Sequence, residues 1–161
     1  MSVLTKEKLA ILGGPKAVTI ENKDVWPIIT DEEVEAVTAL LRARQRSIPY
    51  GMGIIKEFED NFKDYLGVKY ALVQNNGTST LHAAFFAVGV GPGDEVIAPT
   101  YTWPASASPV FLVNGIPVFC DIDRRTFTAD PEDIERKITP STKALVVVHL
   151  WGHPAEMDEI M

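Results

Sequence analysis

A loop of small polar residues, Gln74–His82 (QNNGTSTLH), is the stretch around which the rest of the sequence is organised. It follows a short apolar run, Tyr70–Val73, and leads into a segment with helical apolar spacing that extends to Val88. A strand that turns into a helix leaves the first backbone N–H groups of that helix without partners, at the positive end of its dipole. The loop therefore predicts either an anion site, usually for phosphate, or a plain helix cap formed by Asn76 or Thr78.

Short apolar runs alternate with helical segments along the remaining chain. Besides Tyr70–Val73, strands are expected at Glu95–Ala98, Pro117–Cys120 and Ala144–His149. Helices are expected from a capping box at Thr30 to about Arg44, at Ile55–Leu66, at Thr78–Val88, after Pro104 with a kink or late start at Pro109, from Asp130, and from Glu156. This alternation predicts an α/β fold, a mostly parallel sheet with helices on both faces, preceded by an amino-terminal helical arm.

Charge and composition exclude several classes of protein. The net charge of −7 argues against a nucleic-acid backbone as the main partner, because that partner requires clustered Lys and Arg. Lys6, Glu7 and Lys8 argue against a secretory signal. The long uncharged window from Val96 to Cys120 contains four prolines, so a membrane-spanning helix is not expected there. We expect a soluble, cytoplasmic protein.

Two cofactor motifs are excluded by their context. The glycines Gly89, Gly91 and Gly93 are spaced G-x-G-x-G, but they follow a helix and precede a strand, the reverse of the dinucleotide fingerprint. A G-x-x-x-x-G-K-[ST] run does not occur, which excludes a P-loop.

The remaining reactive side chains favour structural roles. His149 and His153 are four apart, a spacing that joins two metal ligands only on a helix, whereas the intervening residues indicate a loop. We therefore expect no metal site and a hydrogen-bonded loop histidine. Cys120 is expected to be a small buried apolar residue, and Asp121 and Asp123 are expected to form a solvated turn.

Two large rings, Tyr101 and Trp103, follow the strand at Glu95–Ala98. In a parallel α/β sheet, ligands bind at the carboxyl ends of the strands, where the Asn75–Ser79, Thr100–Trp103, Asp121–Asp123 and His149–His153 segments are expected. The rings are either plain core or the wall for a flat cofactor next to the phosphate site. Pyridoxal 5'-phosphate fits such a wall and such a helix end.

At this point the sequence resembles the DegT/DnrJ/EryC1/StrS sugar aminotransferases, which are pyridoxal-phosphate enzymes of fold type I. The matching runs occur in the order found in the family and cover almost the whole chain. They are Trp26-Pro27, Phe58-Glu59, Tyr65–Ala71, Asn76–Ser79, Gly89–Ile97, Pro99–Trp103, Asp121–Asp123 and His149–Asp158.

The resemblance implies specific roles for a few residues. It implies that Gly77, Thr78 and Ser79 hold the cofactor phosphate and that Trp103 stacks on the pyridine ring. It places Tyr50, within Ser47–Gly53, near the substrate. It also implies transfer of an amino group from glutamate or glutamine to a keto sugar, usually nucleotide-linked, or to a keto cyclitol, by a homodimer.

The resemblance also has a limit. Residues 1–67 would form an amino-terminal arm with helices, and residues 68–161 the first part of an incomplete cofactor-binding large domain. The family's Schiff-base lysine and the aspartate partner of the pyridine nitrogen lie on later strands, beyond Met161, so no catalytic residue is assigned here. The strand expected at Tyr70–Val73 would pair with the lysine-bearing strand. The sequence predicts the amino-terminal part of an aminotransferase or, alternatively, a non-catalytic phosphate or nucleotide-sugar binding module.

Overall fold

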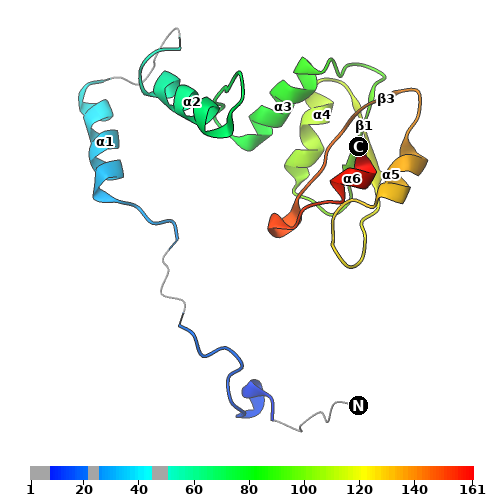
Figure 1. Cartoon of the computed structure of the whole chain (residues 1–161), viewed down its shortest axis with the longest axis horizontal. Helices are drawn as coiled ribbons and strands as arrows, with labels where there is room; N and C mark the ends of the chain where they lie inside the picture. Colours follow the sequence, from blue (N-terminus) through cyan, green and yellow to red (C-terminus); the bar gives the residue numbers. More distant parts are fainter. Residues whose placement is uncertain (1–7, 22–25, 45–50) are drawn as a thin grey trace. The chain divides into compact units, whose positions relative to one another are not determined.

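The computed structural model of the 161-residue chain describes residues 8–21, 26–44 and 51–161 (Figure 1). Internal contacts divide the chain into two units, Met1–Ile54 and Ile55–Met161. None of the helices in the described ranges is long and apolar enough to cross a bilayer.

The first unit contains a short 3-10 turn, η1 (Ala10–Leu12), and the helix α1 (Asp31–Arg42). The predicted capping box is confirmed: the backbone N–H of Glu33 donates to Thr30 Oγ1 at 3.3 Å, and the backbone N–H of Thr30 donates to Glu33 Oε2 at 2.8 Å. The helix ends two residues before the predicted end, because Arg44 turns into the left-handed region with a φ of 57°.

The second unit alternates helices and strands as predicted. Its elements are α2 (Gly53–Leu66), α3 (Gly77–Ala87), β1 (Glu95–Pro99), η2 (Pro104–Ser106), α4 (Ser108–Leu112), β2 (Ile116–Cys120), α5 (Pro131–Lys137), β3 (Thr142–Leu145), η3 (Leu150–Gly152) and α6 (Met157–Ile160). The three strands form a parallel sheet in the order β2-β1-β3, so β1 pairs with β2 on one side and β3 on the other. The α/β fold is confirmed.

Helices cover both faces of this sheet, as expected. Because successive strand residues point to opposite faces, Val96 and Ala98 of β1 pack on one side with Phe85 of α3 and Val110 of α4. Ile97 points to the other side and shares a cluster with Cys120, with Ile134 of α5 and with Ile160 of α6. Val96, Ile97 and Ala98 have no exposed surface, so β1 is the centre of the core.

The prediction of a strand at Tyr70–Val73 is wrong, because this segment forms no strand in the structure. No described strand pairs with this segment, and a strand needs a neighbour to satisfy its backbone groups. The N–H of Val73 donates instead to the carboxylate of Glu59 on α2, at 3.0 Å.

The strand predicted at Ala144–His149 is shorter than expected. It begins at Thr142 and ends at Leu145, although the Val146 N–H still donates to the Ile97 carbonyl at 2.8 Å. After Pro104 the chain forms η2 and then α4, and Pro109 lies in the first turn of α4. The predicted late start is therefore confirmed, since proline fits the first turn of a helix and not its interior.

Candidate functional site

The amino terminus of α3 is capped by Asn76. This residue has an extended backbone, and its Oδ1 accepts a hydrogen bond from the backbone N–H of Ser79 at 2.8 Å. The Thr80 hydroxyl donates to the Asn76 carbonyl at 3.2 Å. Of the two residues considered for the cap, Asn76 is the one that forms it.

The cap leaves a set of donors at the start of α3. No acceptor among the described residues bonds the backbone N–H groups of Gly77 and Thr78, while the Ser79 N–H is occupied by Asn76. The Thr78 side chain is exposed, and Ser79 is half-buried. A Cβ atom added to Gly77 would meet no heavy atom within 4 Å, so the space beside it is open. Two free N–H groups and two hydroxyls at the positive end of the helix dipole form an arrangement that binds anions.

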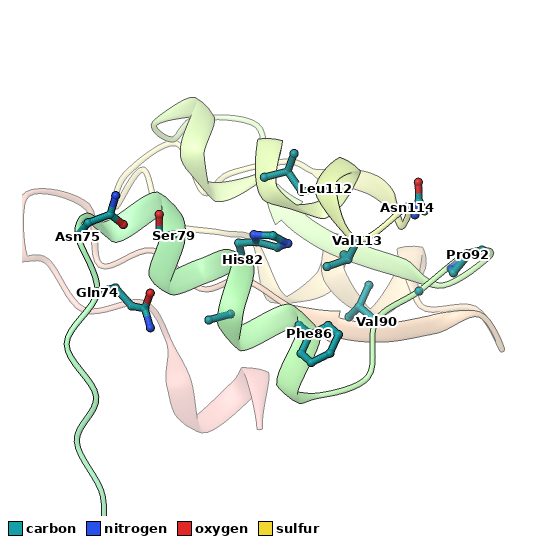
Figure 2. Close-up of a pocket in the computed structure, with 12 residues that line it drawn as sticks. Gln74, Asn75, Ser79, His82, Phe86, Val90, Pro92, Leu112, Val113 and Asn114 are labelled. Atoms are coloured by element: carbon teal, nitrogen blue, oxygen red, sulfur yellow. The ribbon is translucent and has the colours of Figure 1, made fainter. Parts of the chain in front are cut away.

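Two hollows flank this helix start. A groove of about 800 Å³ runs between α3 and α4, with Asn75 and Ser79 at one end, Asn114 at the other and His82 between them (Figure 2). A second hollow, of about 380 Å³, is lined by the apolar side of α2 and by the first turn of α3. His82 was not singled out from the sequence, although it lies one helical turn after Ser79, and this spacing places both on one face of α3.

Trp103 is exposed in the described part of the chain. Its side chain is 78% exposed, and it forms the N-cap of η2. Helix α3 packs against η2, so the elements that carry the anion-binding donors and the Trp103 ring are in contact. Tyr101, two residues earlier, contacts Phe127 and Trp151 with ring centroids 6.0 Å apart in both pairs. These three rings come from the loops that follow β1, β2 and β3, and they confirm that the loops meet at one sheet edge.

The loop after β2 has a structural role, as expected. Asp123 Oδ1 accepts hydrogen bonds from the backbone N–H groups of Arg125 at 2.7 Å and Thr126 at 3.0 Å, and these bonds lower the pKa of its carboxyl group. The thiol of Cys120 is buried, and burial raises its pKa to about 11. A neutral buried thiol is a poor nucleophile, so the expected apolar role is confirmed.

The loop after β3 contains the two histidines. Nδ1 of His149 accepts a hydrogen bond from the backbone N–H of Ala155 at 3.1 Å, which confirms the hydrogen-bonded loop histidine. Within residues 8–21, 26–44 and 51–161, no three His, Cys, Asp or Glu side chains gather in a way that could hold a metal ion. Tyr50, the residue predicted near the substrate, lies outside the described residues.

Known proteins resemble this chain over most of its length. The sequence model of the DegT/DnrJ/EryC1/StrS aminotransferase family matches residues 27–161. The chain is 43% identical to L-glutamine:2-deoxy-scyllo-inosose aminotransferase of Streptomyces lividus, over 96% of this chain and 37% of that protein. It is 51% identical to GDP-perosamine synthase of Caulobacter vibrioides, over 66% of this chain and 29% of that protein.

A solved structure supports the same assignment. The aminotransferase of Psychrobacter cryohalolentis is similar with a TM-score of 0.77 and 40% identity, over 86% of this chain and 35% of that chain. The chain thus spans about a third of the length of the relatives it matches. Since the family match covers most of its residues, the chain belongs to the DegT/DnrJ/EryC1/StrS aminotransferase family.

Proposed function

We propose that this chain is the amino-terminal part of a pyridoxal-phosphate-dependent aminotransferase, which transfers an amino group from glutamate or glutamine to a keto sugar, including nucleotide-linked ones, or to a keto cyclitol. The observation that carries the proposal is the start of α3, where the free N–H groups of Gly77 and Thr78 lie on a helix that packs against the element bearing the exposed Trp103. The relatives named above act on a cyclitol and a nucleotide-linked sugar, which supports these two substrate classes.

Each residue of this site has a distinct task in the proposal. The N–H groups of Gly77 and Thr78 and the hydroxyls of Thr78 and Ser79 bind the cofactor phosphate, and the helix dipole adds to the attraction. Trp103 offers its ring face to the pyridine and orients it. When bound, pyridoxal phosphate supplies an electron sink that stabilises a carbanion next to the transferred nitrogen.

The remaining parts of the proposal concern the whole protein. Residues 1–67 form an arm with helices and residues 68–161 the first part of the cofactor-binding domain, with Tyr50 near the substrate. The Schiff-base lysine is expected outside these 161 residues, so the isolated chain is expected to be inactive. The full-length enzyme is proposed to be a cytoplasmic homodimer.

The test is cofactor binding by the full-length protein. Added pyridoxal phosphate should produce a visible absorbance band, and borohydride should fix the cofactor to a lysine outside these 161 residues, located by peptide mass spectrometry. Binding that borohydride does not make permanent would contradict the enzyme and would support the non-catalytic phosphate-binding module. Trapping on a lysine within the 161 residues would contradict the proposed inactivity of the isolated chain.

The phosphate assignment predicts a specific effect of Thr78→Ala. Cofactor affinity of the full-length protein should fall by about 1–3 kcal/mol, because a charge-assisted hydrogen bond is lost. Thr80→Ala is the matched control, since the Thr80 hydroxyl bonds the Asn76 carbonyl and is not available to a ligand. A fluorescence titration with pyridoxal phosphate measures both variants, and equal affinities would remove Thr78 from the site.

A further inference from the structure

We infer that Trp151 and Phe127 are positioning residues that hold Tyr101, and through it orient the exposed ring of Trp103 towards the cofactor. The inference rests on the function proposed above, because it takes Trp103 as the ring that stacks on the pyridine. It adds a role to two loops that follow β2 and β3, neither of which belongs to the phosphate site.

The three rings form a closed triangle. The ring centroids of Tyr101 and Trp151 are 6.0 Å apart at an interplanar angle of 76°, an edge-to-face contact. Those of Tyr101 and Phe127 are 6.0 Å apart, and those of Phe127 and Trp151 are 6.2 Å apart. Each distance lies within the range in which aromatic pairs attract beyond their burial. Tyr101 is therefore held from two sides.

The two holding residues adopt a backbone conformation that large side chains rarely take. Phe127 has a φ of 61° and Trp151 a φ of 52°, both in the left-handed region. The bond from the Phe127 N–H to the Asp123 carbonyl, at 2.8 Å, fixes one loop, and the bond from the His153 N–H to the Leu150 carbonyl, at 2.9 Å, fixes the other. Strained positions of this kind persist where the surrounding structure enforces them, and they concentrate at functional sites.

Hydrogen bonds fix the backbone of the loop between β1 and η2 on both sides of Trp103, while the Trp103 ring is exposed. The Thr100 N–H donates to the Cys120 carbonyl at 2.9 Å, and Thr102 Oγ1 lies 2.7 Å from Ser106 Oγ. The Ser106 N–H donates to the Trp103 carbonyl at 2.9 Å. One residue separates Tyr101 from Trp103, so anchoring the Tyr101 ring limits the direction in which the Trp103 ring leaves the backbone.

A double-mutant cycle in the full-length protein tests the inference. The variants are Trp151→Ala, Trp103→Ala and the combination, with Trp151→Tyr as the conservative variant. Tyr65→Ala, on the exposed side of α2, is the control for loss of an exposed ring. The dissociation constant of pyridoxal phosphate and the visible circular dichroism of the bound cofactor are measured, because the second reports ring orientation. Thermal unfolding of the cofactor-free protein reports a purely structural effect.

Positioning predicts strong coupling between the two tryptophans. Trp151→Ala should weaken cofactor binding by roughly two- to tenfold and alter the circular dichroism. The same change should have little further effect once Trp103 is Ala, because the ring that Trp151 positions is gone. Trp151→Tyr should bind the cofactor with wild-type affinity and circular dichroism, because an aromatic ring is kept at this position. Tyr65→Ala should also leave both quantities unchanged.

The outcomes separate the inference from the proposed function. Additive effects of Trp151→Ala and Trp103→Ala, or wild-type behaviour of Trp151→Ala, would overturn the positioning role while leaving the cofactor assignment in place. A wild-type protein that does not bind pyridoxal phosphate would refute the proposed function itself. If Trp151→Ala does not fold, Trp151→Leu keeps a branched apolar side chain without an aromatic edge and gives the same decision.

Discussion

Asn76 combines two roles that the sequence presented as alternatives. Its amide oxygen satisfies the Ser79 N–H, and the same cap directs the chain so that the Gly77 and Thr78 N–H groups stay free. A helix start always has several N–H groups without intrahelical partners, and a single side chain satisfies only some of them. Helix capping and anion binding are therefore compatible at this site.

Replacing Asn76 by Asp separates these two roles. Aspartate caps helices as well as asparagine does, so the thermal stability of the cofactor-free full-length protein should be retained. Cofactor affinity should fall by at least about 1 kcal/mol, because like charges 4 Å apart repel by that amount even in water. Asn76→Ala, in contrast, should lower the unfolding free energy by about 1 kcal/mol, because alanine cannot cap the helix. Calorimetry and a pyridoxal phosphate titration measure the two quantities, and undiminished affinity in Asn76→Asp would place the phosphate elsewhere.

At the scale of elements, Asp133 joins α5 to the end of β2. Asp133 is 6% exposed, and its carboxylate accepts the backbone N–H of Asp121 at 2.7 Å and the guanidinium of Arg136 at 3.1 Å. The Asp121 N–H, followed by Arg136, lowers the pKa of Asp133 below its ordinary value of 3.8. This contact fixes the direction in which the chain leaves β2 towards the Phe127 loop.

The lowered pKa predicts a specific acid sensitivity. A carboxyl group whose folded-state pKa is depressed stabilises the fold above its unfolded value of 3.8 and loses that contribution as the pH falls through the folded value. Asp133→Asn should lower stability at neutral pH and reduce the loss of stability on acidification below this value. Urea denaturation of the full-length protein over a pH series measures the slope. Parallel curves for the wild type and the variant would show that Asp133 does not contribute to the pH dependence.

At the scale of the molecule, the described part of the chain leaves much apolar surface uncovered. The apolar side of α2, including Phe58 and Phe62, is exposed, as are Leu72 and Phe86. Within the described residues, β3 pairs with β1 alone and has one free edge. Surfaces and edges of this kind bind other chains or a covering segment.

We therefore expect the isolated 161 residues to associate with themselves. They should bind a hydrophobic dye such as ANS and scatter light as oligomers, whereas the full-length protein should bind much less dye per chain. A monodisperse monomer without dye binding would contradict this expectation, and it would indicate that these side chains are covered within the chain itself.

The sequence predicted what local chemistry decides. The Thr30 capping box and the Asp130 cap depend on residues at most three apart, and both formed where expected, with Asp130 Oδ1 accepting the Glu132 N–H at 3.0 Å. The strand predicted at Tyr70–Val73 did not form, because a strand needs a neighbouring strand to pair with. The local sequence pattern does not show whether such a neighbour is present. His82 was missed for a related reason: the groove that it lines exists only once α4 packs beside α3. The exposure of Trp103 was undecided because a large ring after a strand suits a core equally well.

The strand order β2-β1-β3 also has a consequence for synthesis on the ribosome. Of the three strands, β1 is translated first and can pair with β2 as soon as β2 has been made. Its other neighbour, β3 (Thr142–Leu145), is translated later. The 25 residues between the end of β2 at Cys120 and the end of β3 at Leu145 take about 1–5 s at ordinary elongation rates. During that time Val96, Ile97 and Ala98, which are fully covered in the finished sheet, lie on an open edge of a nascent chain.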